Sequence, residues 1–324
     1  MVEDVEEDVL RTKTLPQGLQ WSYRNQGTAM ATRRVLITGA SSGIGLSLAE
    51  QLCNEGHQVT ITVRDDKKAA STMKILSEKQ VCVDIVQMDF SIWSSVVDGV
   101  NEILRKKMIF DIVIFNAGTM FPDEAATADG VETCFQVNVL GHMYLADVLI
   151  KSRPAGHQVH FVCVSSKLFK LCGSSWPRWR LPKKADDWAE AFRPRSRSGW
   201  RAYALSKFAI TLLASRLDQV DGVTAVAVNP GNAVTNVSRN MPSRHRKLLV
   251  VFKKTLITVE EAAANVLRAS LHPLPHGKFY DQHKTSSLPK ALTSERYLYN
   301  LNHLAQQLVL KISQKLTDSE EGLR

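Results

Sequence analysis

Tyr203 and Lys207 lie four positions apart in Tyr203-Ala204-Leu205-Ser206-Lys207, and on a helix two such side chains share one face. A free tyrosine has a pKa of about 10, so it is a poor acid or base near neutral pH. A neighbouring ammonium group favours the phenolate and lowers that pKa. Tyr203 could then donate a proton to a carbonyl oxygen or accept one from an alcohol. Without further context, a pair at this spacing indicates only a solvated helix face.

A glycine-rich turn, Thr38-Gly39-Ala40-Ser41-Ser42-Gly43-Ile44-Gly45, supplies part of that context. It follows the apolar run 35–37 and leads into a segment whose apolar residues recur at helical spacing. A helix N-terminus presents unpaired N–H groups and the positive end of a dipole, which suits a phosphate. Glycines allow a tight turn and a close approach of the backbone to a pyrophosphate. The turn therefore predicts a dinucleotide site, with an ordinary strand-to-helix turn as the alternative.

Apolar, β-branched runs alternate with segments of helical spacing along the chain. Strands are expected at 35–37, 59–63, 81–88, 110–115, 158–164 and 223–229, and helices at 46–52, 67–80, 94–107, 131–150 and 203–220. This alternation predicts an α/β protein: a doubly wound parallel sheet between two helix layers, in one domain. Right-handed crossovers place the carboxyl ends of parallel strands at one edge, where ligands bind. Polar or turn-forming residues follow these strands, namely Arg64, Asp89, Asn116-Ala117-Gly118, Ser165-Ser166 and Pro230-Gly231.

Arg64 bears on the choice of dinucleotide, because it ends the second expected strand. In a dinucleotide fold this position faces the adenosine ribose, and an arginine there accommodates a 2′-phosphate. NADP(H) is therefore expected ahead of NAD(H). Asp65 could instead bind the ribose hydroxyl, which keeps NAD(H) open, and a solvated loop arginine is a further reading.

Together these motifs resemble the classical short-chain dehydrogenase/reductase family, whose NAD(P)-binding domain has the Rossmann fold. The resemblance covers about residues 33–280. It rests on the glycine turn, Asp89, Asn116-Ala117-Gly118, Asn138, Ser166, Tyr203-Ala204-Leu205-Ser206-Lys207 and Pro230-Gly231-Asn232-Ala233-Val234-Thr235. Residues 129–142 are similar to the branch of retinol dehydrogenases and WW domain-containing oxidoreductases. Residues 1–32 hold one tryptophan and are too short for WW domains.

The resemblance implies a role for each matching residue. Asn138 would hold an ordered water in a proton relay, Ser166 would hydrogen-bond the substrate oxygen, and Tyr203 would be the acid/base. Lys207 would bind the nicotinamide ribose and lower the pKa of Tyr203. Asp89 would contact the adenine amine and Thr235 the nicotinamide carboxamide. The other cofactor-binding positions would be Gly39, Ser41, Ser42, Gly43, Ile44, Gly45, Arg64, Asn116, Ala117, Gly118, Tyr203, Lys207, Pro230 and Gly231.

The segment between the serine and the tyrosine departs from the general family pattern. Ser166 is preferred to Ser165 because the family places a glycine three residues after its catalytic serine, although Phe169 stands there. The insertion at 167–202 is long and contains Trp176, Trp179, Trp188 and Trp200. It could be a surface excursion whose tryptophans pack locally, a wall of an apolar substrate pocket, or a membrane contact.

Composition and charge limit the kinds of molecule that the protein is expected to bind. The 324 residues carry a net charge of +9 but no basic stripe interleaved with aromatics, which disfavours nucleic acid. The five cysteines lack metal-ligand spacing, so we expect no metal site and a reducing compartment. No apolar run is long enough to cross a bilayer, and the acidic start is unlike a secretory or mitochondrial leader. A cytoplasmic protein is expected, with peripheral membrane contact and homo-oligomer formation left open.

The sequence thus predicts a flexible arm at 1–32, a catalytic domain at 33–285 and a C-terminal amphipathic helix and tail at 286–324. The predicted function is NADP(H)-dependent oxidoreduction, in which a carbonyl and an alcohol are interconverted with Tyr203 as acid/base. This is an EC 1.1.1-type activity. The family resemblance suggests a small hydrophobic substrate, such as a retinoid, a steroid or a lipid-derived aldehyde or ketone. The alternative is a cofactor-binding regulatory or scaffold protein with little catalysis.

Overall fold

The computed structural model describes residues 31–173, 181, 185–194, 199–233, 235, 241 and 256–321. The chain divides into two units, Met1–Thr32 and Arg33–Arg324, and the second is described below. Most of the expected arm at 1–32 lies outside the described residues, as do Trp176, Trp179 and Val234.

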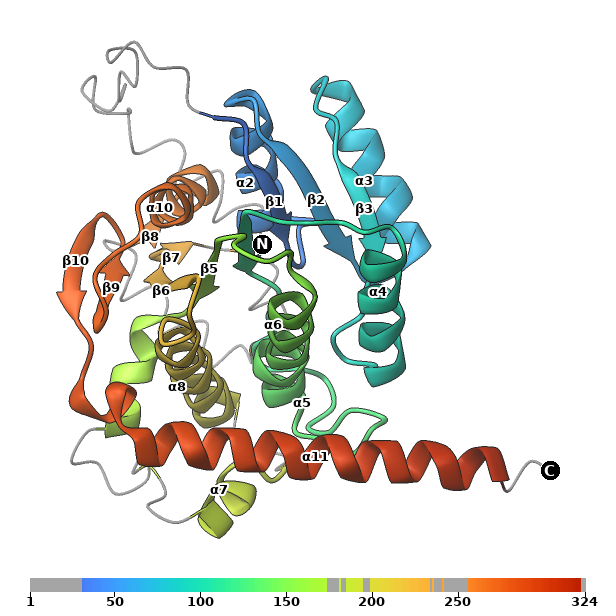
Figure 1. Cartoon of the computed structure of the whole chain (residues 1–324), viewed down its shortest axis with the longest axis vertical. Coiled ribbons are helices and arrows are strands. Elements are labelled where there is room, and N and C mark those ends of the chain that lie inside the picture. Colours follow the sequence, from blue (N-terminus) through green and yellow to red (C-terminus); the bar gives the residue numbers. More distant parts are fainter. Residues whose placement is uncertain are drawn as a thin grey trace. The chain divides into compact units, whose positions relative to one another are not determined.

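The core of the second unit is an eight-stranded sheet in the order β10-β9-β6-β5-β4-β1-β2-β3 (Figure 1). Its strands are β1 (Arg34–Ile37), β2 (Gln58–Val63), β3 (Asp84–Gln87), β4 (Ile112–Phe115), β5 (Val159–Val164), β6 (Val223–Asn229), β9 (Lys278–Asp281) and β10 (Lys284–Ser287). All neighbours pair in parallel except β9 and β10, which are antiparallel. The strand order reverses between β1 and β4, which makes their carboxyl ends the expected ligand site.

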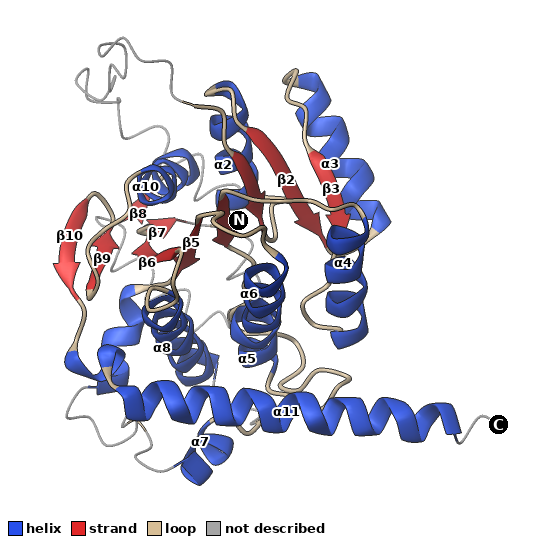
Figure 2. Cartoon of the chain, in the orientation of Figure 1, coloured by secondary structure: helices blue, strands red, loops and turns tan. Residues whose placement is uncertain are grey.

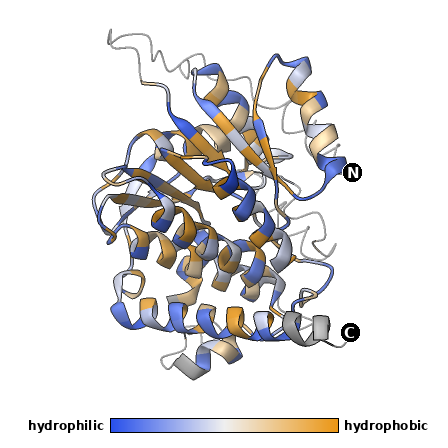
Figure 3. Cartoon of the chain, turned by 45° about the vertical axis from the view of Figure 1, so that its right-hand side comes forward, coloured by the Kyte–Doolittle hydropathy of each residue, from blue (hydrophilic) through white to orange (hydrophobic). Residues whose placement is uncertain are grey.

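Helices cover both faces of the sheet (Figure 2). One face carries α2 (Gly43–Asn54), α3 (Asp66–Glu78) and α10 (Val259–Leu271), and the other carries α4 (Trp93–Arg105), α5 (Thr133–Phe135), α6 (Gly141–Ser152) and α8 (Gly199–Leu217). Side chains of a strand alternate between the two cores: Ile37 and Ile114 face the first layer, whereas Leu36 and Val113 face the second. Figure 3 shows the hydrophobic residues gathered along the strands and the inner helix faces. The predicted doubly wound parallel fold is confirmed.

Two further helices lie outside α8, namely α7 (Ala185–Ala191) and α11 (Glu295–Glu321) (Figure 1). The buried side of α11 includes Leu301 and Leu304, which join the core around α8. Trp188 of α7 is fully buried, with its ring centroid 6.0 Å from that of Tyr297 on α11. The C-terminal amphipathic segment therefore packs on its own domain. Among the described residues, no helix is both long and apolar enough to cross a membrane.

The long helix expected at 131–150 is interrupted. A π-helical turn, Gln136–Leu140, separates α5 from α6, and the N–H of Gly141 bonds the carbonyl of Gln136, five residues back. Asn138 stands in the middle of this turn, and its amide bonds residues outside the helix. Such single π-turns are common at functional sites. The sequence predicted an uninterrupted helix because its apolar residues keep helical spacing. The bonds of Asn138 to Thr119 and Ser206 join residues distant in sequence, so they leave no mark on that spacing.

Candidate active site

The glycine turn is fixed to the end of β4. The Thr38 hydroxyl oxygen accepts the backbone N–H groups of Asn116 and Ala117, each at 3.0 Å. In return, the Asn116 side chain donates from Nδ2 to the carbonyls of Thr38 at 2.9 Å and Gly39 at 3.0 Å. The two predicted cofactor-binding motifs therefore form one bonded unit at the point where the strand order reverses. Asn116 acts here by holding the turn in place.

Two positions of the turn require glycine because a side chain there would collide with the Asn116-Ala117 segment. Gly39 has a φ of +65°, and a Cβ there would lie 2.7 Å from Cα of Ala117. A Cβ on Gly45 would lie 2.5 Å from Nδ2 of Asn116. Ser42, the N-cap of α2, makes no side-chain capping bond, which leaves the first N–H groups of that helix for a ligand. Ser41, Ser42, Gly43 and Ile44 are all partly exposed. This surface fits a dinucleotide phosphate.

The segment after β6 lies against the same turn. A Cβ on Gly43 would lie 3.5 Å from the Thr235 side chain, so the predicted carboxamide-binding threonine is next to the glycine turn. Pro230 is held through its carbonyl, which accepts from Nδ2 of Asn265 at 2.9 Å. Gly231 has a φ of +109°, and a Cβ there would collide with Ile257.

At the expected adenosine end, Arg64 and Asp65 are paired with each other. Arg64 Nε donates to Asp65 Oδ2 at 2.9 Å, and both side chains are nearly half exposed. Asp65 is also the N-cap of α3 and accepts the Lys68 N–H at 2.7 Å, a bond that lowers the pKa of its carboxyl. Its structural task is therefore helix capping, which leaves Arg64 as the better candidate to bind a ligand.

Asp89 follows β3 but its side chain faces its own turn. Oδ1 accepts from both the N–H and the hydroxyl of Ser91, at 2.8 and 2.6 Å, and the Asp89 N–H donates to Ser95. The residue thus closes the turn into α4. Its predicted contact with the adenine amine stays a proposal.

The predicted catalytic side chains meet at the carboxyl end of β5. Tyr203 and Lys207 are both buried on α8, with Nζ 5.5 Å from the centre of the Tyr203 ring. Lys207 Nζ donates to the carbonyl of Val164 at 2.9 Å, and the Ser166 side chain lies close enough to Tyr203 to lower the pKa of its phenol. A Cβ on Gly118 would lie 3.6 Å from Lys207 Nζ, so this group adjoins the motif that holds the glycine turn.

The two serines after β5 have different surroundings. Ser165 is buried, and its hydroxyl lies 2.6 Å from Oγ1 of Thr211 and donates to the Lys207 carbonyl. It therefore braces α8 against the sheet, whereas the Ser166 side chain lies next to the Tyr203 phenol. Phe169, where the family pattern has glycine, is buried and packs edge-on against Phe279 with ring centroids 5.4 Å apart.

Asn138 uses both amide hydrogens and one lone pair of its amide oxygen within the protein. Oδ1 accepts the Thr119 N–H at 2.7 Å, while Nδ2 donates to the Thr119 carbonyl at 3.0 Å and to the Ser206 hydroxyl at 2.8 Å. Ser206 in turn donates to the carbonyl of Tyr203 at 2.8 Å. The amide thus locates the catalytic helix, and its predicted role in holding an ordered water stays a proposal.

Burial is the largest influence on the pKa values of both Tyr203 and Lys207. Burial raises the pKa of Tyr203, and the nearby Ser166 side chain offsets only part of that rise. Burial also lowers the pKa of Lys207 to about 8, so this side chain gives up its proton more readily than an exposed lysine. The predicted lowering of the Tyr203 pKa by Lys207 stays a proposal.

Apolar residues surround Tyr203. A cluster forms from Met120, Phe121, Leu168, Trp200 and Met241, with the rings of Phe121 and Trp200 edge-to-face at 5.4 Å. The two ends of the insertion therefore contribute to the walls around the tyrosine. Within the insertion, Trp188 on α7 instead packs against α11, as a locally packed excursion would.

Sequence reasoning did not single out three residues of this region: His142, Ser206 and Glu132. Ser206 and His142 bond the Asn138 segment, and Glu132 is a buried carboxyl at the start of α5. Glu132 and His142 fall within residues 129–142, the stretch that is similar to the retinol dehydrogenase branch. The sequence does not show that these polar side chains are buried, because burial depends on the fold.

Glu132 gives a testable pH effect on stability. Burial raises the pKa of its carboxyl from 4.5 to about 7, although it accepts the Phe135 N–H. The folded state therefore keeps a proton between these pH values that the unfolded chain has lost. Raising the pH through this window should lower the free energy of unfolding by about 3 kcal/mol. Urea unfolding at pH 4.5, 6 and 8 should show this loss in the native chain, while Glu132→Gln removes it. The exposed control Glu124→Gln should keep it; a loss that persists in Glu132→Gln would assign it to another group.

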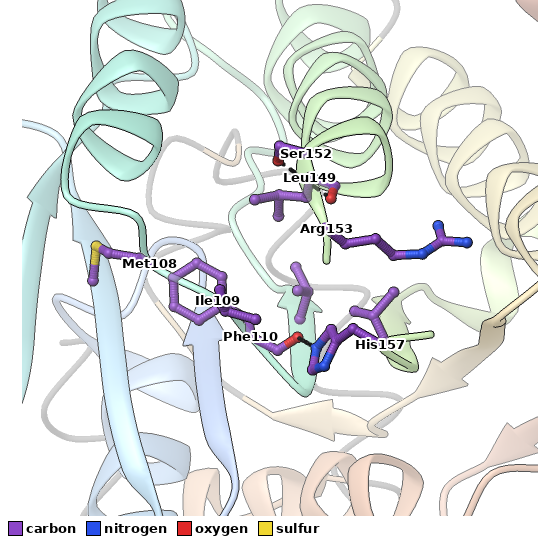
Figure 4. A pocket seen from close by; sticks show the side chains of 9 residues that line it. Met108, Ile109, Phe110, Leu149, Ser152, Arg153 and His157 are labelled. Carbon is purple, nitrogen blue, oxygen red and sulfur yellow. Dashed lines mark hydrogen bonds between the residues drawn. The ribbon is translucent and has the colours of Figure 1, made fainter. Parts of the chain in front are cut away.

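A pocket at the amino ends of β4 and β5 lies away from these groups. Figure 4 shows the side chains of Phe110, Leu149, Arg153 and His157 around it. His157 Nε2 is 3.0 Å from the Phe110 carbonyl. None of the predicted site residues lines this pocket.

The fold and the site define the class of protein. A doubly wound sheet with a glycine turn at its reversal point is a dinucleotide-binding fold, and here a Tyr–Lys–Ser group stands at the same edge. The family model described as short chain dehydrogenase matches residues 33–177. Retinol dehydrogenase 12 of Homo sapiens is 32% identical over 286 residues, which cover 83% of this chain and 84% of that protein. The chain belongs to the short-chain dehydrogenase/reductase family, which confirms the resemblance seen in the sequence.

Two further comparisons show how much of the chain other proteins match. WW domain-containing oxidoreductase of Homo sapiens is 31% identical over 232 residues, covering 66% of this chain and 52% of that protein. The chain thus spans about half the length of that relative. The crystal structure of an uncharacterised protein from Mycobacterium paratuberculosis aligns with a TM-score of 0.63 at 25% identity, over 88% of this chain and 97% of that one.

Proposed function

We propose that this chain is an oxidoreductase that interconverts a carbonyl compound and an alcohol with NADP(H). The observation that carries the proposal is the meeting of Tyr203, Ser166 and Lys207 at the sheet edge that also holds the glycine turn. A protein that only bound a dinucleotide would have no need of a buried phenol beside a serine and a lysine.

The chain's own residues would bind the cofactor and move a proton. The dinucleotide would lie along the glycine turn, Asn116-Ala117-Gly118, Pro230-Gly231 and Thr235, and when bound it supplies or takes up the electron pair of the reaction. In reduction, Ser166 donates a hydrogen bond to the carbonyl oxygen and Tyr203 transfers its proton to that oxygen. In oxidation, Tyr203 accepts the proton of the alcohol. Lys207 adds positive charge beside the ring, which favours the phenolate once a proton has left.

The proposed substrate is hydrophobic: a retinoid, a steroid or a lipid-derived aldehyde or ketone. The apolar side chains of Met120, Phe121, Trp200 and Met241 around Tyr203 support this choice. An apolar wall with few polar groups binds substrates through the area they bury. The name of the relative retinol dehydrogenase 12 points to the same class of alcohol. A soluble protein of the cytoplasm with peripheral membrane contact would suit such a substrate.

A cofactor-consumption assay tests the function. Purified protein saturated with NADPH is mixed with a panel of retinoid, steroid and aliphatic carbonyl compounds, and absorbance of the reduced nicotinamide is followed. Turnover of at least one apolar carbonyl is expected. Tight cofactor binding with no turnover in either direction would favour the alternative of a regulatory or scaffold protein.

Arg64 tests the choice of cofactor. We expect Arg64→Ala to raise the Kd for NADPH about tenfold and to change the Kd for NADH less than about twofold, because a charge-assisted bond to the 2′-phosphate is lost. Nucleotide fluorescence titration measures both values. Arg105→Ala removes another exposed arginine, at the far end of α4, and should alter neither Kd. Equal losses for both nucleotides in Arg64→Ala would mean that Arg64 does not contact the 2′-phosphate.

A further inference from the structure

His142 is buried beneath the candidate site with a bond from each ring nitrogen. It is the second residue of α6, and its ring lies between those of Phe90 and Phe115, with centroid distances of 4.5 and 4.7 Å. Nε2 is 2.9 Å from Oγ1 of Thr38, and Nδ1 is 3.2 Å from the carbonyl oxygen of Asn138. One imidazole therefore joins the glycine turn to the π-helical turn.

The direction of each bond follows from counting hydrogens. The Thr38 hydroxyl already accepts two backbone N–H groups, from Asn116 and Ala117, which uses both of its lone pairs. Its own hydrogen must go elsewhere, and His142 Nε2 at 2.9 Å is nearer than the Ile114 carbonyl at 3.4 Å. Nε2 is then the acceptor, so the ring hydrogen is on Nδ1 and is donated to the Asn138 carbonyl. Only this tautomer satisfies both bonds.

We propose that His142 is a positioning residue that, as the neutral Nδ1–H tautomer, holds the backbone of Asn138 and the glycine turn in fixed relation. This inference rests on the proposed oxidoreductase function. On one side the linkage continues from Thr38 into the Asn116-Ala117 backbone, which shapes the cofactor surface. On the other it continues from Asn138 through Ser206 to the carbonyl of Tyr203. Cofactor position and proton-transfer geometry thus share one buried side chain.

The surroundings keep this imidazole neutral. His142 is fully buried between aromatic rings, and burial lowers its pKa to about 3, with the charge of Lys207 acting in the same direction. A neutral ring has one donor and one acceptor, which matches the two partners. A protonated ring would place a second hydrogen against the Thr38 hydroxyl.

Nitrogen NMR of histidine-labelled protein tests the tautomer directly. The signal pair that disappears in His142→Gln is assigned to His142 among the nine histidines. We expect a protonated Nδ1 and an unprotonated Nε2, with no change from pH 5 to 8. A ring protonated on Nε2, or one that titrates near pH 6.5, would overturn the proposal.

Two amide substitutions separate the two bonds. In His142→Gln the new amide oxygen reaches the place of Nε2 and can accept from Thr38, while the bond to Asn138 is lost. In His142→Asn the new amide nitrogen stands near the place of Nδ1 and can donate to Asn138, while the bond to Thr38 is lost. Both variants lose the aromatic contacts of the ring, so each is the packing control for the other.

The expected result is a split between kcat and cofactor affinity. His142→Gln should lower kcat about tenfold and change the Kd for NADPH less than about twofold. His142→Asn should raise the Kd for NADPH about tenfold and leave kcat at saturating NADPH within about threefold. Equal losses of both quantities in the two variants, as from a general loss of stability, would overturn the proposal. If the native chain turns over no carbonyl compound, the proposed oxidoreductase function fails. The proposal about His142 is still tested in that case, by the tautomer seen in NMR and by the difference in Kd between the two variants.

Discussion

Replacing Tyr203 with phenylalanine is expected to lower kcat for carbonyl reduction at least about a thousandfold, the upper part of the range for losing a general acid. The phenyl ring keeps its place on α8 among Met120, Trp200 and their neighbours, so the pocket wall persists. Lys207 keeps its bond to the Val164 carbonyl, so the Kd for NADPH should change less than about twofold. Single-turnover kinetics with pre-bound NADPH measures the chemical step apart from binding.

The control removes a buried tyrosine hydroxyl elsewhere. Tyr280 donates to the His272 carbonyl at 2.9 Å and lies in the core on the opposite face of the sheet. Tyr280→Phe should cost about 1 kcal/mol of stability and leave kcat within about twofold. If Tyr203→Phe retains a tenth or more of native kcat, the proton must come from another group, and the role proposed for Tyr203 is wrong.

The same tyrosine sets the direction of the pH dependence. Because burial raises its pKa, Tyr203 holds its proton through the neutral range, which suits donation to a carbonyl. Oxidation needs the phenolate, so its rate should increase as the pH rises. Lys207, with a pKa lowered to about 8, loses its charge above that pH and with it part of the stabilisation of the phenolate. The rise in oxidation rate should therefore flatten in alkaline solution.

The sheet and the edge that carries the site could be predicted from the sequence because parallel strands are buried on both sides. β2 illustrates this: five of its six residues are buried, and the run Val59 to Val63 is continuously β-branched. Turn residues such as Gly39 and Pro230 mark the ends of such strands. The right-handed crossover rule then places these ends together without any knowledge of contacts.

Some elements near the C-terminal end of the sheet, β10 and α10 among them, were not predicted. β10 reads Lys284-Thr285-Ser286-Ser287, an exposed edge strand whose pairing with β9 leaves no hydrophobic signal. The helix α10 carries a full capping box between Thr258 and Glu261, a local signal that could have located its start. The segment that follows α10 and forms β9 has no clear strand pattern in the sequence, so α10 could not be placed against the sheet.

The hydrogen bonds within the site join residues that are far apart in the sequence, so no local sequence pattern predicts them. His142 and Thr38 are 104 residues apart, and Asn138 and Ser206 are 68 apart. The sequence motifs identified Asn138 and Tyr203, but not the hydrogen bonds of the asparagine amide to Thr119 and Ser206. The raised pKa of Tyr203 was missed for a related reason, since burial is a property of the fold and the sequence shows only the neighbouring lysine.

Replacing Gly39 with alanine is expected to abolish NADPH binding, with Kd raised at least about a hundredfold, and to lower the free energy of unfolding by about 3 kcal/mol. The φ of +65° costs any residue with a Cβ about 1 kcal/mol. The larger effect is steric, because the new methyl group would lie 2.7 Å from the backbone Cα of Ala117. That backbone cannot yield freely, since the Ala117 N–H is bonded to the Thr38 hydroxyl. The turn and the Asn116-Ala117-Gly118 segment must therefore separate, which spoils the phosphate surface.

Gly156 provides the matched control for the Gly39 substitution. It has a similar φ of +75°, but a Cβ there would meet no atom within 4 Å. Gly156→Ala therefore carries the backbone cost alone and should lower stability by about 1 kcal/mol with no change in the Kd for NADPH. Urea unfolding and nucleotide fluorescence titration of the two variants give the comparison. If Gly39→Ala costs no more stability than Gly156→Ala and still binds NADPH, the close approach of the glycine turn to Ala117 does not shape the cofactor site, and the phosphate must bind elsewhere along the sheet edge.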